Sequence, residues 1–216
     1  MARPSLDLTL YLVTDTVLCG EVGVARTAAQ AVAAGATVVQ LRDPACTDEE
    51  FVRLGTELRE VLEGTSVPLI VNDRVHLVDA IGADGAHVGQ GDLDPRSARK
   101  QLGPEPYLGL SVQEVDHVGA ARRLPRETVD YLGVGPVWTQ VTKPDAAAPS
   151  SPETLARVVR ASPWPCVAIG GIDASRVPAV RRSGAAGVAV VSAVCGRPDP
   201  AAATRELLVA WEEHTS

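Results

Sequence analysis

Two aspartates, Asp73 and Asp92, follow successive apolar runs of the chain, and a pair of carboxylates can do metal chemistry. If the two runs are neighbouring strands of a parallel sheet, the carboxylates come from adjacent strand ends. Two carboxylates without a histidine suit Mg²⁺, a hard ion that prefers oxygen ligands and also binds substrate phosphates. The alternative is that each aspartate caps the helix that follows it. The spacing alone supports both interpretations equally.

Two glycines, Gly170 and Gly171, follow another apolar run and precede a helical pattern. Bare backbone N–H groups at such a turn bind phosphate well. In (β/α)8 barrels the phosphate often lies at the loops after strands seven and eight, which here begin at Gly170 and near Ser192. An ordinary strand-to-helix turn is the alternative, and the position in the strand count favours phosphate.

Two cations are placed to meet an anion. Lys143 is one of two lysines in the chain and lies in the longest loop, residues 138–151. A flexible cation there could close over an anionic substrate. Arg42 ends an apolar run, where an unpaired charge is costly, so it should face a carboxylate or a phosphate. The alternatives are a solvated surface lysine and a structural pair of Arg42 with Asp43 or Asp15.

No nucleophile, redox or zinc motif accompanies these residues. Ser111 has no GxSxG context and no obvious His–Asp partner, so a hydrogen-bonding role suits it. The four histidines show no HxH or HExxH spacing, and only His87 is near the candidate site. There a buried wall histidine is favoured over a catalytic base. The four cysteines form no CxxC pair.

Eight short runs rich in Val, Leu and Ile alternate with eight helical patterns along the chain. The runs are nearly continuous, as expected for strands covered on both faces, so the sheet should be parallel. Eight units in 216 residues average 27 residues each, which predicts an α/β fold, a single (β/α)8 TIM barrel in one domain over residues 1–216. A doubly wound open sheet is the alternative. The predicted strands are residues 8–13, 37–41, 69–71, 85–88, 107–110, 129–134, 166–169 and 187–191; the predicted helices are residues 22–34, 48–62, 76–81, 96–102, 115–124, 152–161, 174–182 and 200–211.

The composition excludes several classes of protein. The chain carries 20 Lys and Arg against 27 Asp and Glu, a formal net charge of −7, with three Trp, three Tyr and one Phe. A nucleic-acid binder would need a basic face or a stacking platform. No stretch approaches the roughly 18 apolar residues of a membrane span, and the first residues do not form a signal peptide. We therefore expect a cytoplasmic protein without nucleic-acid or membrane partners, and a homo-oligomer stays open.

Together these segments resemble the thiamine-phosphate synthase family. The resemblance follows the family's order over nearly the whole chain. It rests on a series of short motifs rather than on any one of them: YLVTD at 11–15, VQLR at 39–42, VNDR at 71–74, ADGAHVGQGD at 83–92, GLSV at 109–112, GVGPV at 133–137, TK at 142–143, IGGI at 169–172 and VVSA at 190–193.

The resemblance implies a (β/α)8 barrel that joins two small molecules. They are an aminopyrimidine-methyl diphosphate and a thiazole phosphate in its carboxylate form, and the products are thiamine phosphate and pyrophosphate. The resemblance implies Mg²⁺ on Asp73 and Asp92. It places the pyrimidine diphosphate at Gln40, Leu41, Arg42, Asp43, Pro44, Asn72, Ser111 and Lys143, of which Arg42, Ser111 and Lys143 are expected to be catalytic. It places the thiazole phosphate at Gln140, Val141, Thr142, Gly171, Val191 and Ser192.

Two positions depart from the family pattern. Pro44 stands where the family usually has a lysine two places after the arginine of the strand-two motif. Gln140 stands where a threonine is usual. These departures leave room for a barrel that binds thiamine phosphate or its precursors without catalysis. A second alternative is a thiazole tautomerase from a sister group, which has a histidine at the position of Gln113.

Overall fold

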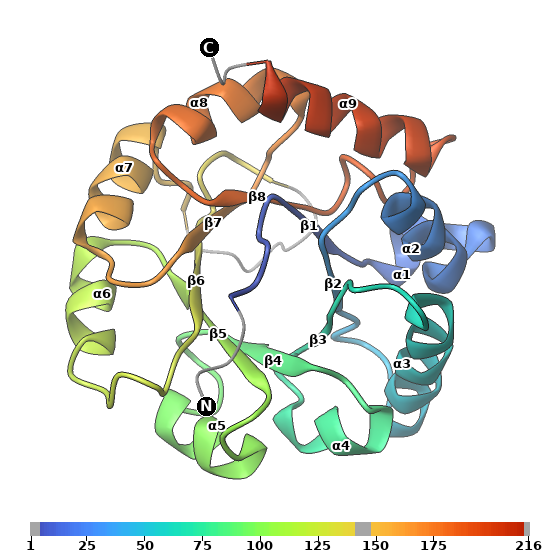
Figure 1. Cartoon of the computed structure of the whole chain (residues 1–216), viewed down its shortest axis with the longest axis horizontal. Coiled ribbons are helices and arrows are strands. Elements are labelled where there is room, and N and C mark those ends of the chain that lie inside the picture. Colours follow the sequence, from blue (N-terminus) through green and yellow to red (C-terminus); the bar gives the residue numbers. More distant parts are fainter. Residues whose placement is uncertain (1–4, 141–147, 214–216) are drawn as a thin grey trace.

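Eight parallel strands close into one barrel in this computed structural model, which describes residues 5–140 and 148–213. The strands run in the order β1 to β8, and β8 pairs with β1 through Val190 and Leu12. Figure 1 shows the helices as a ring around the strands. The predicted barrel is confirmed, and the open-sheet alternative is wrong because the sheet closes on itself. The strands are β1 (Leu10–Val13), β2 (Val38–Leu41), β3 (Leu69–Asn72), β4 (Gly85–Val88), β5 (Tyr107–Val112), β6 (Tyr131–Val134), β7 (Cys166–Ile169) and β8 (Gly187–Val190).

The helices follow their strands largely as the sequence predicts. A short helix not predicted from the sequence, α1 (Thr16–Cys19), forms because the Asp15 carboxylate accepts the N–H of Leu18 and caps it. The helix predicted over residues 76–81 begins as a 3₁₀ turn, Val75–Leu77. The other helices are α2 (Val24–Ala33), α3 (Asp48–Leu62), α4 (Val78–Ile81), α5 (Pro95–Leu102), α6 (Val115–Ala121), α7 (Pro152–Ala161), α8 (Val177–Arg182) and α9 (Pro200–Glu212), with further 3₁₀ turns at Gly20–Val22 and Ala174–Arg176. Among the described residues, none of these helices has the length and apolar character needed to cross a membrane.

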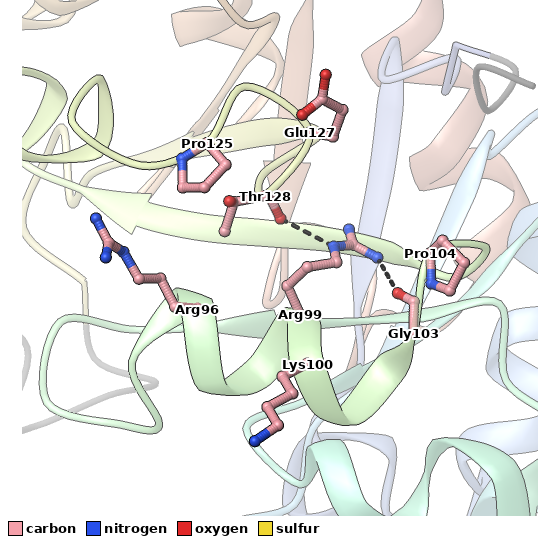
Figure 2. A pocket seen from close by; sticks show the side chains of 8 residues that line it. All are labelled: Arg96, Arg99, Lys100, Gly103, Pro104, Pro125, Glu127 and Thr128. Atoms are coloured by element: carbon pink, nitrogen blue, oxygen red, sulfur yellow. Dashed lines mark hydrogen bonds between the residues drawn. The ribbon is translucent and has the colours of Figure 1, made fainter.

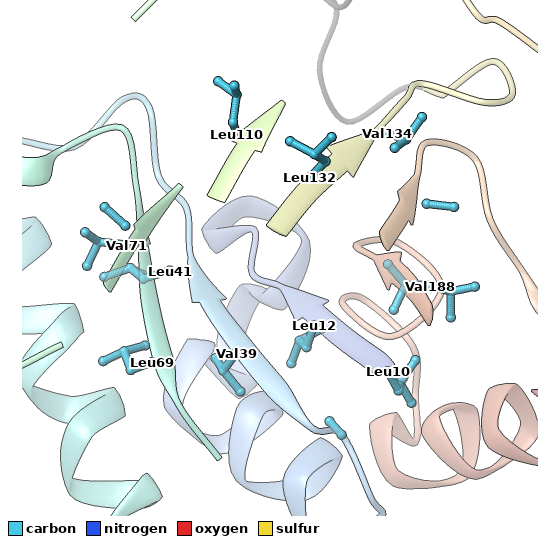
Figure 3. Close-up of a cluster of buried hydrophobic side chains, with 14 of the residues drawn as sticks. Leu10, Leu12, Val39, Leu41, Leu69, Val71, Leu110, Leu132, Val134 and Val188 are labelled. Atoms are coloured by element: carbon cyan, nitrogen blue, oxygen red, sulfur yellow. The ribbon is translucent and has the colours of Figure 1, made fainter. Parts of the chain in front are cut away.

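Successive side chains of each strand point to opposite faces of the sheet, and both faces are buried. In β1, Leu10 and Leu12 pack outward against the helices, as Figure 3 shows. Tyr11 and Val13 belong to a separate cluster inside the barrel. That interior cluster also contains Leu8, Val38, Ile70, Tyr131, Val167 and Ala189. This alternation decides which residues near a strand end can enter a site at the barrel mouth.

Two arginine–aspartate clamps close the amino ends of neighbouring strands. Asp84, just before β4, accepts the N–H of the first residue of β3 and a hydrogen bond from Arg59 of α3, both at 2.8 Å. Asp130, just before β6, accepts the N–H of the second residue of β5 at 2.7 Å and a hydrogen bond from Arg99 of α5 at 2.8 Å. Each clamp therefore ties a helix to two paired strands at the base of the barrel.

Arg99 is the more deeply engaged of the two arginines, with a side chain 14% exposed. Its Nε donates to the carbonyl of Thr128 at 3.1 Å, and one terminal nitrogen donates to the carbonyls of Gly103 at 3.0 Å and Pro106 at 2.6 Å. Figure 2 shows this guanidinium between α5 and the segment before β6. One side chain therefore fastens the chain both before β5 and before β6.

We expect Arg99→Ala to lower the free energy of unfolding by about 2–3 kcal/mol, because Asp130 then loses its charged partner and the loop carbonyls lose their donors. The control is Arg53→Ala, which removes an exposed i,i+4 pair with Glu57 and should cost no more than about 0.5 kcal/mol. Urea unfolding followed by circular dichroism measures both. Equal losses in the two variants would contradict the role of the clamp.

Candidate active site

The candidate residues gather at the carboxyl ends of the strands, the face that carries the chemistry in barrels of this kind. Gln40 near the end of β2 and Ser111 near the end of β5 both hydrogen-bond to interior side chains. Asn72, the last residue of β3, alternates with the interior Ile70 and faces the same way. Leu41 is fully buried in the outer cluster, so only its backbone can reach the site.

Asp73 lies directly after β3 with a φ of 60°, the one non-glycine residue with a positive φ in the described part of the chain. Its N–H donates to the carbonyl of His87 at 2.9 Å, and its Oδ2 accepts from Asn72 Nδ2 at 2.6 Å. Residues with a Cβ adopt this conformation at a cost, and such strain collects at functional sites. The next helix has Arg74 as its N-cap without a side-chain bond, so Asp73 is an exposed carboxylate and not a cap.

Asp92, in the loop after β4, is likewise not the cap of the next helix. Its Oδ2 accepts the N–H of Gly89 at 2.8 Å. The N-cap of α5 is Asp94, whose side chain accepts two backbone N–H groups of the first turn. The capping alternative is therefore wrong for both Asp73 and Asp92.

Both aspartates are tied to the end of β4. The backbone N–H of Asp73 donates to the carbonyl of His87, and the carboxylate of Asp92 accepts the N–H of Gly89 two residues further on. The described residues contain no group of three or more His, Cys, Asp and Glu side chains arranged to hold a metal. Mg²⁺ is commonly bound by one or two carboxylates together with substrate phosphates and water. An exposed pair of aspartates therefore fits Mg²⁺ better than a metal that needs a full protein ligand set.

The loop after β2 begins with Arg42, Asp43 and Pro44. The side chain of Arg42 is 15% exposed, and its terminal nitrogen lies 4.0 Å from Asp15 Oδ2. The structural pair with Asp15 is thus present, at a separation longer than a hydrogen bond. The alternative pairing with Asp43 does not form. Arg42 therefore stands at the barrel mouth with a loosely held guanidinium.

Arg74, directly after Asp73, holds this loop in place. It donates to the carbonyls of Cys46 at 2.5 Å and Asp43 at 3.3 Å and to Asp48 Oδ1 at 2.7 Å, and it stacks on Phe51 at 4.6 Å. Burial raises the pKa of Asp43, but backbone N–H groups of the same loop and the charge of Arg74 hold it below its usual range. The sequence motif contained Arg74 without showing this role, because its partners lie 26 to 31 residues away.

The turn after β7 has both glycines in positive φ, 101° at Gly170 and 65° at Gly171. A Cβ on Gly170 would lie 2.5 Å from Pro136 Cα, and one on Gly171 would lie 2.5 Å from the carbonyl oxygen of Thr139. The loops after β6 and β7 thus pack backbone against backbone. Only glycine gives this turn both its conformation and its close approach.

Arg176, in the 3₁₀ turn Ala174–Arg176, fastens the glycine turn from the other side. Its guanidinium donates to the carbonyl of Gly171 and lies 5.3 Å from the centre of the Trp138 ring. Neither residue belongs to a recognised motif, so nothing in the sequence pointed to this contact. Val191 is partly buried and Ser192 exposed after β8, and Gln140 is half-buried. Val141, Thr142 and Lys143 lie outside the described residues.

A chain of hydrogen-bonded side chains crosses the barrel interior. Gln40 Nε2 donates to Tyr11 Oη at 2.7 Å, and the phenol oxygens of Tyr11 and Tyr131 lie 2.8 Å apart. His87 Nδ1 lies 3.1 Å from Tyr131 Oη, and His87 Nε2 lies 2.9 Å from Ser111 Oγ. Burial raises the pKa of both phenols well above the ordinary value, so both stay protonated. The expected wall role of His87 is confirmed, whereas the two tyrosines, 120 residues apart, were not anticipated.

Two cavities lie away from these residues. One, of about 510 Å³, lies beside α5 and the segment before β6, where Arg96, Arg99 and Lys100 line it (Figure 2). The other, of about 620 Å³, lies at the amino ends of the strands beside Arg59 and Asp84. Both adjoin the clamps of the barrel base. Neither includes a residue proposed for the site.

Gly109 of β5 makes room for the interior chain, because a Cβ there would lie 2.3 Å from both His87 Nδ1 and Tyr131 Cζ. We expect Gly109→Ala to lower the free energy of unfolding by about 1–3 kcal/mol through overpacking. The control is Gly119→Ala in α6, where a Cβ would meet nothing within 4 Å. This change should raise the free energy of unfolding by up to about 1 kcal/mol, because alanine favours the helix over glycine. Urea unfolding compares the variants, and a Gly109→Ala protein as stable as the parent would refute the crowding.

A family model for thiamine monophosphate synthase matches residues 10–194. A thiamine-phosphate synthase from Psychrobacter sp. is 42% identical over 203 residues, which covers 94% of each chain. One from Xanthobacter autotrophicus is 44% identical over 210 residues, covering 97% of this chain and 98% of the relative. The solved thiamine phosphate pyrophosphorylase from Pyrococcus furiosus is 31% identical with a TM-score of 0.85, covering 97% of this chain and 98% of that one. Since these matches span the barrel from β1 to the loop after β8, the chain belongs to the thiamine monophosphate synthase family.

Proposed function

We propose that this chain is a thiamine-phosphate synthase that joins a pyrimidine-methyl diphosphate to a thiazole phosphate at the carboxyl-end face of its barrel. The relatives that it matches are named for this reaction's product. One observation carries the site assignment: Asp73 and Asp92 follow neighbouring strands, cap no helix, and stand on the face where Gln40, Asn72 and Ser111 point inward.

The pyrimidine diphosphate is assigned to the ends of β2, β3 and β5. Gln40, Asn72 and Ser111 offer neutral hydrogen-bonding groups for the ring, and Arg42 offers positive charge for the diphosphate. The two aspartates would hold Mg²⁺, which when bound neutralises charge on the leaving diphosphate. Leu41 contributes through its backbone at the end of β2, and Asp43 and Pro44 belong to the following loop, which Arg74 anchors through the carbonyls of Asp43 and Cys46.

The thiazole phosphate is assigned to the loops after β7 and β8. The glycine turn at Gly171 and the segment Val191 and Ser192 supply backbone N–H groups and a hydroxyl, which suit a phosphate. Gln140 stands at the near end of the long loop. Val141, Thr142 and the catalytic assignment of Lys143 rest on the sequence alone.

The reaction itself needs no covalent nucleophile. Departure of diphosphate leaves a pyrimidine-methyl cation that the ring amine stabilises. The protein must meet the charge on the leaving group, hold the thiazole nitrogen in line with the methylene carbon and exclude water. Arg42 at the barrel mouth serves the first task, and a closed barrel wall whose polar groups bond to one another serves the last.

Gln113 argues against the tautomerase alternative. It stands where that enzyme group has a histidine, and a neutral amide cannot act as a general acid and base near neutral pH. Its backbone N–H donates to Nδ1 of His117, which lies in α6 behind the strand end. The synthase therefore accounts for this position and for the paired aspartates together.

The reaction of this family acts on small molecules. The absence of nucleic-acid and membrane partners, a cytoplasmic location and a possible homo-oligomer remain predictions. Size-exclusion chromatography with light scattering settles the last of these.

A direct assay tests the proposed function. With both substrates and Mg²⁺, we expect one pyrophosphate released for each thiamine phosphate formed, and loss of turnover when a chelator removes the metal. Chromatography detects the product and a coupled colorimetric assay detects pyrophosphate. If calorimetry finds tight substrate binding but no product forms at high enzyme concentration, the non-catalytic barrel replaces the synthase.

We predict that Asp92→Ala lowers kcat/KM by about 100-fold or more without unfolding the protein, because a metal ligand is lost while the structure keeps its caps. Asp94→Ala is the matched control two residues away, since it removes the N-cap of α5. It should cost about 1 kcal/mol of stability and leave turnover intact. Equal activity in the two variants would contradict the metal assignment.

A further inference from the structure

The interior chain from Gln40 to Ser111 joins two groups assigned to the pyrimidine, and its three middle members have so far served only to close the barrel wall. Gln40 comes from β2, Tyr11 from β1, Tyr131 from β6, His87 from β4 and Ser111 from β5. Tyr11 is 1% exposed and Tyr131 is fully buried. A buried hydroxyl that lacks an acceptor is costly, so each phenol proton must have a place to go.

The order of donors follows from that requirement. Gln40 Nε2 can only donate, so Tyr11 Oη accepts from it. In the described residues, the one other hydrogen-bond partner of the Tyr11 hydroxyl is Tyr131 Oη, which must take its proton. The Tyr131 proton then goes to His87 Nδ1. His87 therefore carries its proton on Nε2 and donates it to Ser111 Oγ.

We infer that this chain fixes the hydrogen-bonding polarity of the pyrimidine site, with His87 as the positioning residue for Ser111. At one end Ser111 Oγ accepts from His87, so its own proton is free to be donated to the substrate. At the other end Gln40 Nε2 is committed to Tyr11, and Gln40 Oε1 is left to accept a hydrogen bond. This inference rests on the proposed assignment of both residues to the pyrimidine.

The carbonyl oxygen of the Gln40 side chain makes no hydrogen bond to another described residue. It is not fully enclosed by protein, so a substrate can reach it. An accepting carbonyl suits the amino group of a 4-aminopyrimidine. A 4-oxo analogue would set its own carbonyl against it and leave both oxygens unpaired. A site that loses such a bond rejects the analogue strongly. The polarity set by the chain thus selects the amino substrate.

The tautomer of His87 is the first test, and it requires no catalysis. Nitrogen NMR of the intact protein labelled with ¹⁵N-histidine resolves four imidazoles, and His87→Gln identifies the His87 signals. We expect the proton on Nε2 and the lone pair on Nδ1. The opposite tautomer would mean that Gln40 is turned over and the chain runs in reverse, which overturns the inference even if the enzyme makes thiamine phosphate.

A double-mutant cycle is the second test, measured as kcat and KM for the pyrimidine diphosphate. His87→Phe keeps a ring in the space and should lower kcat/KM about tenfold, the effect of one lost hydrogen bond. In a Ser111→Ala background the same change should have almost no further effect, because His87 acts through Ser111. Full additivity of the two changes would refute the positioning role.

His87→Gln is the conservative variant, because its amide places an acceptor and a donor on either side of one carbon, as the two imidazole nitrogens are. It should recover most of the activity lost in His87→Phe. Competition between the amino substrate and its 4-oxo analogue should show at least a tenfold preference for the amino compound in the parent protein. An analogue that binds equally well would overturn the selectivity. Absence of any product with the parent enzyme would instead refute the proposed function.

Discussion

Strict alternation of inward and outward side chains in a closed parallel barrel is the constraint on which the rest of the structure depends. Each strand has four to six residues, so it offers only two or three side chains to the interior. Near the carboxyl ends those positions hold Gln40, Asn72, His87 and Ser111. The outward neighbours, such as Leu41, are committed to packing against helices. The candidate site therefore takes one inward residue from each of four neighbouring strands, β2 to β5, whose relative positions are fixed by the barrel.

Polar groups inside a barrel must bond to one another, because water does not reach them. The interior chain satisfies this condition across five strands, and it needs space that only glycine leaves. Gly109 and Gly133 both face the His87 ring, and a Cβ on either would approach it within 3 Å. The glycines in these strands are thus the counterpart of the bulky His87 and Tyr131. The same glycines therefore allow both the close packing of this interior and its hydrogen bonds.

The sequence was sufficient for the barrel, the strand ends and the glycine turn, because these depend on local pattern and on the count of units. It was insufficient wherever the decisive contact is remote. Asp92 resembled a helix cap until Asp94 proved to be the cap of α5. The contact between Tyr11 and Tyr131 joins opposite halves of the chain. Arg74 belongs to a recognised motif, but its hydrogen bonds to the carbonyls of Asp43 and Cys46 depend on how the loops after β2 and β3 meet in space.

The acidic chain must meet two anions, and among the described residues the fold already engages two of the three arginines near the candidate site. Arg74 bonds to Asp48 and to the loop carbonyls, and Arg176 bonds to the glycine turn. Arg42 is held more loosely than Arg74 or Arg176, since its nearest carboxylate oxygen is 4.0 Å away. Pro44 stands where the family resemblance leads us to expect a lysine. Coulombic attraction falls with distance and solvent, so charge remote from the diphosphate cannot compensate. Neutralisation must therefore come from close contacts, which in the proposed function are Arg42 and the ion that the exposed aspartate pair would hold.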